Sequence, residues 1–173
     1  KIGLLGYENT FSVNKSEVIN TSNNSEILFR GIKTSAGNQT GNLKSLMGIN
    51  TFILDEAEEL VDETIFDTID LSIREKTTQN RVVLILNPTT KEHWIYKRFF
   101  EQRGVEAGFN GVKDNICYIH TNYLDNKDNL STSFLERVED IKHNNFKKYN
   151  HSILGSWLAK AEGVVFENWS IGE

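Results

Sequence analysis

Two short apolar runs constrain the fold more than any other feature of this sequence. Thr51–Leu54 and Val82–Leu86 consist largely of Ile, Leu, Val and Phe, and neither alternates with polar residues. Continuous apolar runs of this length indicate strands buried on both faces, as in a parallel sheet. Similar runs lie at Glu26–Phe29 and Ile116–Ile119.

Helical patterns lie between and after these runs. Apolar residues recur at helical spacing in three segments, which are marked by Val61, Ile65, Ile69 and Ile73, by Phe134, Val138 and Ile141, and by Phe146, Tyr149, Ile153 and Trp157. This spacing places the apolar side chains on one face of a helix. Strands that alternate with helices predict an α/β fold with a mostly parallel sheet flanked by helices.

Composition limits the class of protein. The chain has 173 residues, enough for one domain with a sizeable core. Its hydrophobic and charged fractions, 38% and 25%, are those of ordinary soluble proteins, and no apolar run approaches the length needed to cross a bilayer. A single cysteine, Cys117, excludes an intrachain disulfide, and its apolar neighbours predict a small core residue. Trp94, Trp157 and Trp169 are expected to anchor packing rather than to stack on nucleic-acid bases.

The charge balance bears on nucleic-acid binding. The formal net charge of −5 argues against a broadly basic binding surface. A local cluster of Lys97, Arg98 and Arg103 could contact DNA phosphates, and a solvated helix face explains it equally well. The four histidines show no close ligand spacing, so no zinc site is predicted.

The first apolar run ends in two adjacent carboxylates, Asp55 and Glu56. In a parallel sheet they would lie at the carboxyl end of a buried strand, where α/β sheets bind ligands. One acid can hold Mg²⁺ while the other polarises an attacking water, which is the Walker B pattern with a catalytic glutamate. The first turn of a helix explains the same residues, because Glu58 and Glu59 follow and acidic side chains are favoured in a first helical turn.

The second run ends in Asn87, followed by Pro88, Thr89 and Thr90. In ATPases of the additional-strand class, the strand beside Walker B ends in a polar residue that senses the γ-phosphate. Asn87 stands in that position. A plain turn is the simpler interpretation, since Asn-Pro starts turns and Thr89 can cap the next helix through a capping box with Glu92.

The segment GNQTGNLKS, Gly37 to Ser45, has parts of a phosphate-binding loop but not its spacing. The P-loop lysine directly follows its glycine, whereas two residues separate Gly41 from Lys44. Lys44 is also too close to Asp55, because a P-loop is followed by its own helix before the Walker B strand. No other G-x-x-x-x-G-K-[ST] occurs in the chain, which therefore carries half of a nucleotide site.

An ordered series of segments resembles the large terminase subunit of tailed bacteriophages, in its PBSX-type branch. The series covers nearly the whole chain, and its members are ILFRG, NLKSL, ILDEAEEL, LILNPTT, HTNYLDN, LGSW and GVVFENW. The resemblance implies a P-loop NTPase-like fold of the additional-strand class. It further implies that residues 1–173 are part of a terminase ATPase domain, with the Walker A segment and the nuclease domain outside them. The first residue, Lys1 rather than Met, also suggests a fragment or a processed product.

The same resemblance implies roles for single residues. Asp55 would bind Mg²⁺ and Glu56 would activate the hydrolytic water. Asn87, Thr89 and Thr90 would contact the nucleotide and match the motif that couples hydrolysis to DNA movement. Lys44 would act on the ATP of a neighbouring subunit, although terminases carry an arginine near this place and a solvated loop lysine explains it as well.

The resemblance implies an ATP-dependent motor that moves viral DNA into the procapsid, in a protein that also cuts concatemeric DNA. Its partners would be double-stranded viral DNA, the portal protein and the small terminase subunit. It would form a homo-oligomeric ring in the host cytoplasm and dock transiently on the portal. The isolated chain would hydrolyse ATP poorly without Walker A.

Two alternatives remain open at this stage. Asp55-Glu56-Ala57 is shared with DEAx-type DNA helicases, although these usually carry Ser-Ala-Thr where this chain has Asn87-Pro88-Thr89-Thr90. The other alternative is a non-catalytic assembly or DNA-binding module that keeps a P-loop-like fold. ATP turnover separates the enzymes from the module.

Overall fold

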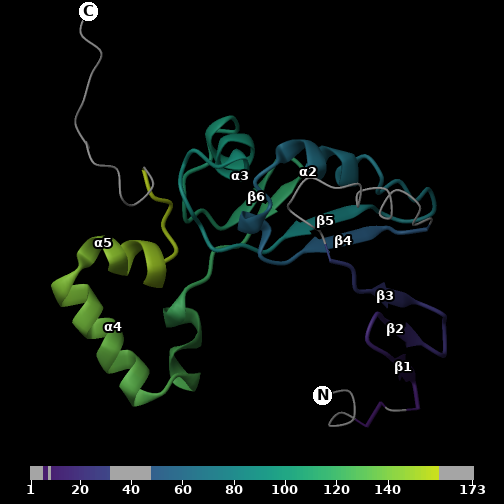
Figure 1. The fold of residues 1–173 in the computed structure, drawn as a ribbon, viewed down its shortest axis with the longest axis horizontal. Helices are drawn as coiled ribbons and strands as arrows, with labels where there is room; N and C mark the ends of the chain where they lie inside the picture. The colour runs from purple at the N-terminus through teal and green to yellow at the C-terminus, as the bar shows by residue number, and fades with distance from the viewer. Residues whose placement is uncertain (1–5, 8, 32–47, 160–173) are drawn as a thin grey trace, which may run out of the picture. The chain divides into compact units, whose positions relative to one another are not determined.

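The structure is a computed structural model that describes residues 6–7, 9–31 and 48–159. The chain divides into two compact units, Lys1–Asn42 and Leu43–Glu173. Each unit is described by itself (Figure 1). No helix in these described ranges is long and apolar enough to cross a membrane.

The first unit contains a three-stranded antiparallel meander. Strand β1 (Phe11–Val13) pairs with β2 (Glu17–Asn20), and β2 pairs with β3 (Glu26–Leu28). Asn14 closes the first turn, because its carboxamide oxygen accepts from the backbone N–H groups of Ser16 and Glu17. The predicted strand at residues 26–29 therefore forms, but in an antiparallel edge position, where Ile27 is 60% exposed.

The second unit is built on one parallel strand pair. Strand β4 (Thr51–Leu54) lies in register with β5 (Arg81–Leu84), so that Phe52 pairs with Val82. The crossover between them carries helix α2 (Glu63–Asp70), which lies on one side of the pair (Figure 1). Asp62 caps this helix by accepting from the Thr64 backbone N–H, and Phe66 and Ile69 are its buried residues. The predicted βαβ unit is confirmed here.

Burial of the parallel pair differs from the prediction. Both strands alternate between exposed and half-buried residues, and Ile53 is 59% exposed. The continuous apolar runs predicted two buried faces, yet among the described residues only one face of the pair is covered. Parallel pairing is likewise confined to β4 and β5, since the remaining strand pairs of the described ranges are antiparallel. The α/β class holds, and "mostly parallel" is correct for this pair alone.

An aromatic core follows β5. The short helix α3 (Trp94–Tyr96) continues into the π-helical turn η3 (Lys97–Glu101), and Trp94 and Ile95 are buried. The Trp94 ring centroid lies 4.9 Å from that of Phe66, and the indole N–H donates to the backbone carbonyl of Leu60. Trp94 therefore anchors α3 against α2 and the segment before it, as predicted for a packing residue.

The hairpin of β6 (Gly111–Lys113) and β7 (Ile116–Tyr118) adds to this core through Tyr118. Tyr118 is buried, and its hydroxyl donates to the carbonyl of Phe99 at 2.6 Å. Successive strand residues face opposite sides, so Cys117 points outward and is exposed. The prediction that Cys117 is a core residue is wrong for this reason.

The remaining elements are helical. The 3-10 segment η4 (Tyr123–Asn129) begins with a capping box formed by Asn122 and Asp125, and Ser131 caps α4 (Thr132–Asn144). The short helix α5 (Phe146–Lys148) and the π-helical turn η5 (Tyr149–Ile153) follow. Val138 and Tyr149 are buried, as their predicted stripes require, but Phe146 of the same predicted stripe as Tyr149 is 63% exposed, so these predictions hold only in part. The chain then returns to the segment after β5, where Leu158 forms an isolated parallel bridge with Thr90.

Candidate active site

Asp55 and Glu56 stand where β4 ends, as the sequence predicts. Both residues are exposed. Glu56 adopts the left-handed backbone conformation, with φ 53° and ψ 46°, and its N–H donates to Asp55 Oδ1 at 3.1 Å. A residue with a side chain is disfavoured there by roughly 1–2 kcal/mol. Such strain persists only where surrounding structure fixes the backbone, and it gathers at functional sites.

The neighbouring strand fixes this turn. The N–H of Ile85 donates to the Leu54 carbonyl, and the N–H of Ala57 donates to the Ile85 carbonyl, both at 2.9 Å. These bonds extend the parallel pairing beyond the strand ends, and Ala57 is fully buried. The backbone of the two acids is thereby held beside the segment that leads to Asn87.

Asn87 is joined to the acidic segment through a residue that sequence reasoning treated as an acidic helix start. Its side-chain nitrogen donates to Glu58 Oε1 at 3.1 Å, across 29 residues of sequence. Within the described ranges no hydrogen bond joins the Asn87 side chain to Asp55 or Glu56. The two predicted motifs therefore meet at Glu58, whose other carboxylate oxygen, Oε2, is buried without a hydrogen-bond partner among the described residues.

His93 bonds the backbone of Glu58. Its ring Nε2 lies 3.1 Å from the Glu58 carbonyl oxygen, and its Nδ1 accepts from the Ile95 backbone N–H at 3.2 Å. A carbonyl only accepts, so Nε2 must carry the proton and Nδ1 the lone pair. The neutral ring thus caps α3 and ties it to the turn after β4, a role that no spacing pattern in the sequence indicates.

Thr89 and Thr90 lie beside this cluster but do not cap the helix. The N-cap of α3 is His93, so the predicted capping box of Thr89 with Glu92 is wrong. The Thr89 carbonyl accepts from Leu158 N–H at 2.8 Å, and the Leu158 carbonyl accepts from Lys91 N–H at 2.8 Å. Thr89 Oγ1 is buried and has no hydrogen-bond partner within the described part of the chain.

Comparison with known proteins assigns the chain to a protein family. The sequence model described as phage terminase large subunit matches residues 2–156 of the chain. The chain belongs to the phage terminase large-subunit family. This confirms the resemblance derived from the ordered segments.

One curated relative and one solved structure are similar to this terminase chain. The large terminase subunit of Bacillus phage SPP1 is 37% identical over 87 residues, which are 50% of the chain and 18% of that protein. The large terminase of a thermophilic bacteriophage superposes with a TM-score of 0.63 at 14% identity, over 91% of the chain and 36% of the thermophilic phage protein. The terminase chain thus has the fold of a segment of that protein and spans well under half of either relative.

The residues at the β4 edge fit the Mg²⁺ that this family of ATPases uses. Mg²⁺ is commonly held by one or two carboxylates together with substrate phosphates and waters. Asp55 offers such a carboxylate, and one of its oxygens is already oriented by the Glu56 N–H. In the described residues no group of three or more His, Cys, Asp or Glu forms a complete metal cage. A metal shared with nucleotide phosphates is therefore the kind of site that these residues suit.

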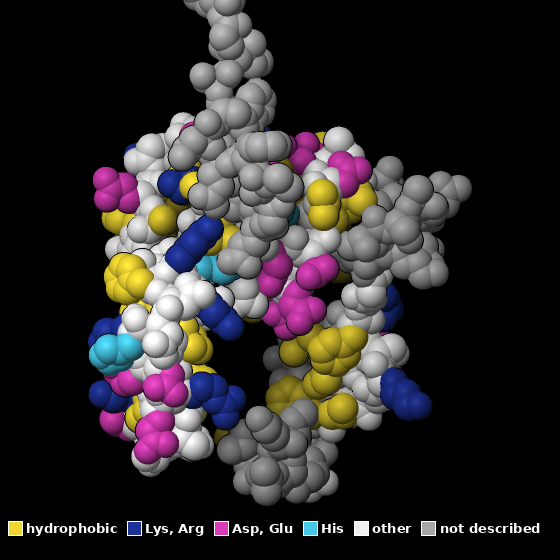
Figure 2. Space-filling view, turned by 60° about the vertical axis from the view of Figure 1, so that its left-hand side comes forward, with side chains coloured by type: hydrophobic (Ala, Val, Ile, Leu, Met, Phe, Trp, Pro, Cys, Tyr) yellow, Lys and Arg dark blue, Asp and Glu magenta, His cyan; other side chains and the backbone are white. Residues whose placement is uncertain are grey.

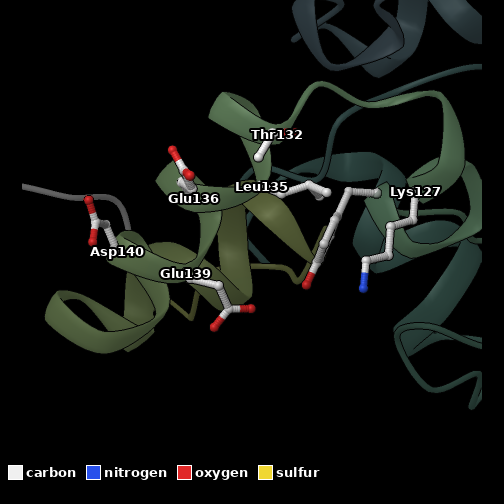
Figure 3. A pocket seen from close by; sticks show the side chains of 7 residues that line it. Lys127, Thr132, Leu135, Glu136, Glu139 and Asp140 are labelled. Carbon is white, nitrogen blue, oxygen red and sulfur yellow. The ribbon is translucent and has the colours of Figure 1, made fainter.

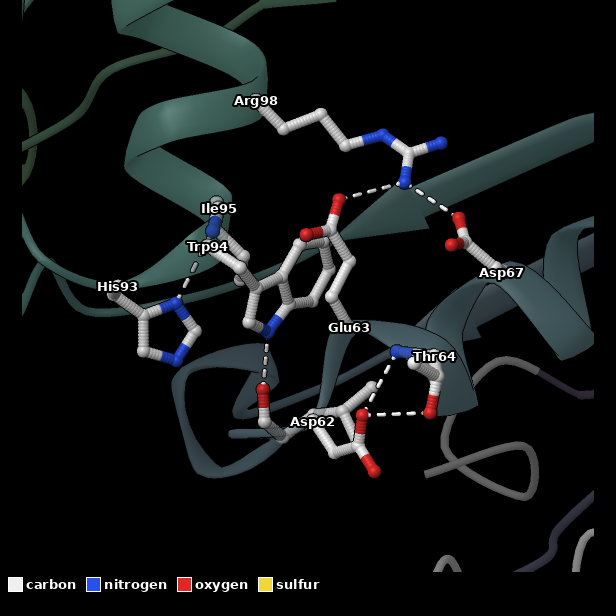
Figure 4. A network of polar contacts seen from close by, with 9 residues as sticks. Asp62, Glu63, Thr64, Asp67, His93, Trp94, Ile95 and Arg98 are labelled. Carbon is white, nitrogen blue, oxygen red and sulfur yellow. Dashed lines mark hydrogen bonds and ion pairs between the residues drawn. The ribbon is translucent and has the colours of Figure 1, made fainter.

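Lys44, the predicted trans-acting cation, lies outside the described residues. The basic cluster after α3 is described, and two of its members are engaged internally. Arg98 Nη1 lies 3.0 Å from Glu63 Oε1 and 2.6 Å from Asp67 Oδ1 (Figure 4). Burial alone would lower the pKa of Arg98, but the hydrogen bonds and the charge attraction of Asp67 and Glu63 together outweigh this and raise it.

The other members of the cluster differ in exposure. Arg103 lies 3.5 Å from Asp114, and Lys97 is exposed without an ion pair among the described residues. On the face drawn in Figure 2, basic side chains are scattered among acidic ones. DNA contact by the whole cluster is therefore not supported by its geometry, because Arg98 serves to fasten η3 to α2.

A shallow pocket lies between η4 and α4, away from the predicted site residues. Its lining residues are shown in Figure 3 and are Tyr123, Lys127, Thr132, Leu135, Glu136, Glu139 and Asp140. The hydroxyl of Tyr123 hydrogen-bonds that of Tyr149, which raises the pKa of Tyr123 to about 12. None of the predicted catalytic or nucleotide-binding residues among the described ones lines this pocket.

Proposed function

We propose that this chain carries the hydrolytic half of the ATPase site of a phage DNA-packaging motor. One observation supports the proposal most strongly: the Ala57–Ile85 backbone bond and the Asn87–Glu58 side-chain bond bring Asp55, Glu56 and Asn87 to one edge of the parallel pair. Sheets of this kind bind ligands at the carboxyl ends of their strands.

The two adjacent acids take different tasks. Asp55 would hold Mg²⁺ through a carboxylate oxygen, and the bound ion would neutralise charge on the phosphates of ATP. Glu56 accepts a proton from, or orients, the water that attacks the γ-phosphate. The left-handed turn at Glu56 changes the chain direction directly after Asp55, so the two carboxylates need not point the same way.

The segment after β5 reports the state of the γ-phosphate. The Asn87 amide donates to a γ-phosphate oxygen, and Thr89 and Thr90 complete the nucleotide contact and couple it to DNA movement. Leu158 is bonded to this segment from the far end of the chain, at the Thr89 carbonyl and the Lys91 N–H. A shift of the Asn87 segment would therefore also move the backbone around Leu158.

The whole protein would act as a homo-oligomeric ring on the portal, with double-stranded viral DNA, the portal protein and the small terminase subunit as partners. It would translocate DNA into the procapsid, cut concatemeric DNA, and work in the host cytoplasm. Residues 1–173 would form part of the ATPase domain, with Walker A and the nuclease domain elsewhere, and Lys44 would act on a neighbouring subunit's ATP. The isolated chain should turn over ATP poorly.

The test uses the complete gene product, with any residues beyond this chain. ATP hydrolysis is measured with and without double-stranded DNA, together with strand separation on a forked duplex. We expect DNA-stimulated hydrolysis without unwinding. Unwinding would favour the DEAx-type helicase. The Asn87-Pro88-Thr89-Thr90 segment and the match to the terminase family argue against that class. No hydrolysis by the folded protein would favour a non-catalytic module.

A further inference from the structure

We propose that Glu58 is a positioning residue of this ATPase site, which holds the Asn87 amide in the orientation that contacts the nucleotide. The inference rests on the proposed function and adds a residue to it. The juxtaposition that carries it is the 3.1 Å hydrogen bond from the Asn87 side-chain nitrogen to Glu58 Oε1.

The local fold sets the direction of Glu58. The 3-10 turn η2 (Ala57–Glu59) is closed by a bond from the Glu59 N–H to the Glu56 carbonyl at 2.9 Å. The Ala57 N–H binds the start of this turn to the Ile85 carbonyl just after β5, and the His93 ring bonds the Glu58 carbonyl. The turn is thus held at two backbone points, and the half-buried side chain of Glu58 meets Asn87.

The chemistry of the pair sets the direction of Asn87. An ionised carboxylate only accepts hydrogen bonds, so the amide must turn its NH₂ group toward Glu58. One N–H is then used by Glu58, while the second N–H and the carbonyl oxygen remain for other partners. Asn87 itself is exposed, and without Glu58 its amide could adopt either flip. Glu58 therefore selects one of two arrangements of the predicted γ-phosphate sensor.

The second carboxylate oxygen of Glu58 makes no hydrogen bond to the protein. Glu58 Oε2 is buried and has no partner among the described residues, and a buried carboxylate oxygen without a hydrogen bond is costly. A water or a ligand group would satisfy it, so the bond that fixes the pair is the one from Asn87 to Oε1. Glu59, the next residue in the same turn, is exposed and makes no side-chain hydrogen bond in the described ranges.

The test is a set of variants in the complete gene product, with kcat and KM for ATP measured for each. Glu58→Ala should lower kcat about tenfold, the equivalent of one lost hydrogen bond, and change KM less than about twofold. Glu58→Gln should retain most of the activity, because its carboxamide oxygen can still accept from Asn87. Glu59→Ala is the matched control and should behave as the wild type.

A double-mutant cycle separates positioning from other roles. If Glu58 acts through Asn87, the Glu58→Ala/Asn87→Ala protein should be no slower than Asn87→Ala alone. Additive losses would overturn the inference. So would a Glu58→Gln protein as slow as Glu58→Ala, because that result would mean that the charge itself acts on the metal or the water.

A second readout does not depend on turnover. In the wild-type protein one of the two Asn87 side-chain amide protons should be protected from solvent exchange by its hydrogen bond, and Glu58→Ala should speed the exchange of that proton more than of the other. No difference between wild type and Glu58→Ala would overturn the inference even if ATP is hydrolysed. Failure of the proposed function is recognised separately, by Glu56→Gln retaining hydrolysis.

Discussion

The backbone N–H of Ala57 donates to the carbonyl of Ile85 at 2.9 Å, beyond the ends of β4 and β5. Ala57 reaches this partner because Glu56 enters the left-handed region and turns the chain across the neighbouring strand. The strained residue is also the predicted catalytic glutamate. The turn after β4 and the proposed hydrolytic role therefore both depend on Glu56, and different substitutions at this residue can separate the two.

Replacing Glu56 by glycine should relieve the strained turn while it abolishes hydrolysis. Glycine adopts positive φ without steric cost, so the free energy of unfolding should be higher by roughly 1 kcal/mol than that of Glu56→Ala. Chemical denaturation of the two variants measures this difference. Equal stability of the glycine and alanine proteins would show that the turn at Glu56 is not strained.

Trp94 should contribute to stability through its indole N–H as well as its packing. Trp94→Phe leaves the Leu60 carbonyl without its donor and should lower the free energy of unfolding by roughly 1–3 kcal/mol. Trp157→Phe is the control, because the Trp157 indole N–H makes no hydrogen bond among the described residues although its ring is also buried. Equal losses for the two variants would assign the effect to ring size alone.

Substitutions of Arg98 and Lys97 should have different effects on stability and on DNA binding. Arg98→Ala removes two ion pairs and the stacking of the guanidinium on Phe66 and should cost roughly 1–2 kcal/mol of stability. Lys97→Ala should leave stability unchanged. If the exposed lysine contacts DNA, only Lys97→Ala should weaken binding and reduce its salt dependence. A stable Arg98→Ala protein that loses DNA affinity would contradict the structural role of Arg98.

The cap of α2 predicts a dependence of stability on pH. Hydrogen bonds from the Thr64 hydroxyl and backbone N–H lower the pKa of Asp62 below its ordinary value of 3.8. A lowered folded-state pKa means that the cap contributes fully above about pH 4 and loses its contribution as the pH falls through the folded value. The difference in urea midpoint between pH 6 and pH 3 should therefore be smaller for Asp62→Asn than for the wild type.

Asp140→Asn is the control for this pH experiment, because Asp140 is exposed and accepts no hydrogen bond within the described part of the chain. It removes one carboxyl group without removing a cap. If Asp140→Asn reduces the difference in urea midpoint between pH 6 and pH 3 as much as Asp62→Asn does, the loss of any carboxyl group, rather than of the cap, would explain the effect.

The parts of the fold that depend on local pattern could be predicted from the sequence. The run at Thr51–Leu54 coincides with β4, and the spacing of Val138 with its neighbours lies within α4. Pairing could not be predicted in the same way. The run at residues 26–29 has the composition of a buried strand, yet it forms an antiparallel edge strand. It pairs with β2, which like β1 contains polar residues and was therefore not recognised as a strand.

The candidate site shows the same division. Asp55, Glu56 and Asn87 could be predicted as candidates because each follows an apolar run, and the parallel register places the ends of these runs side by side. Glu58 and His93 were missed because their roles depend on the 3-10 turn and on a contact across 35 residues, neither of which has a periodic signature. Arg98 was misjudged as a free cation because its partners, Glu63 and Asp67, come from a separate helix.

The measurement that tests the catalytic assignment most directly is single-turnover ATP hydrolysis by the complete gene product carrying Glu56→Gln, with Glu59→Gln as the control. We expect Glu56→Gln to lower the hydrolysis rate by at least about 100-fold while ATP binding stays within about twofold of the wild type. Glu59→Gln should leave both unchanged. Hydrolysis by Glu56→Gln at the wild-type rate would contradict the assignment of this edge of the β4–β5 pair as the catalytic site.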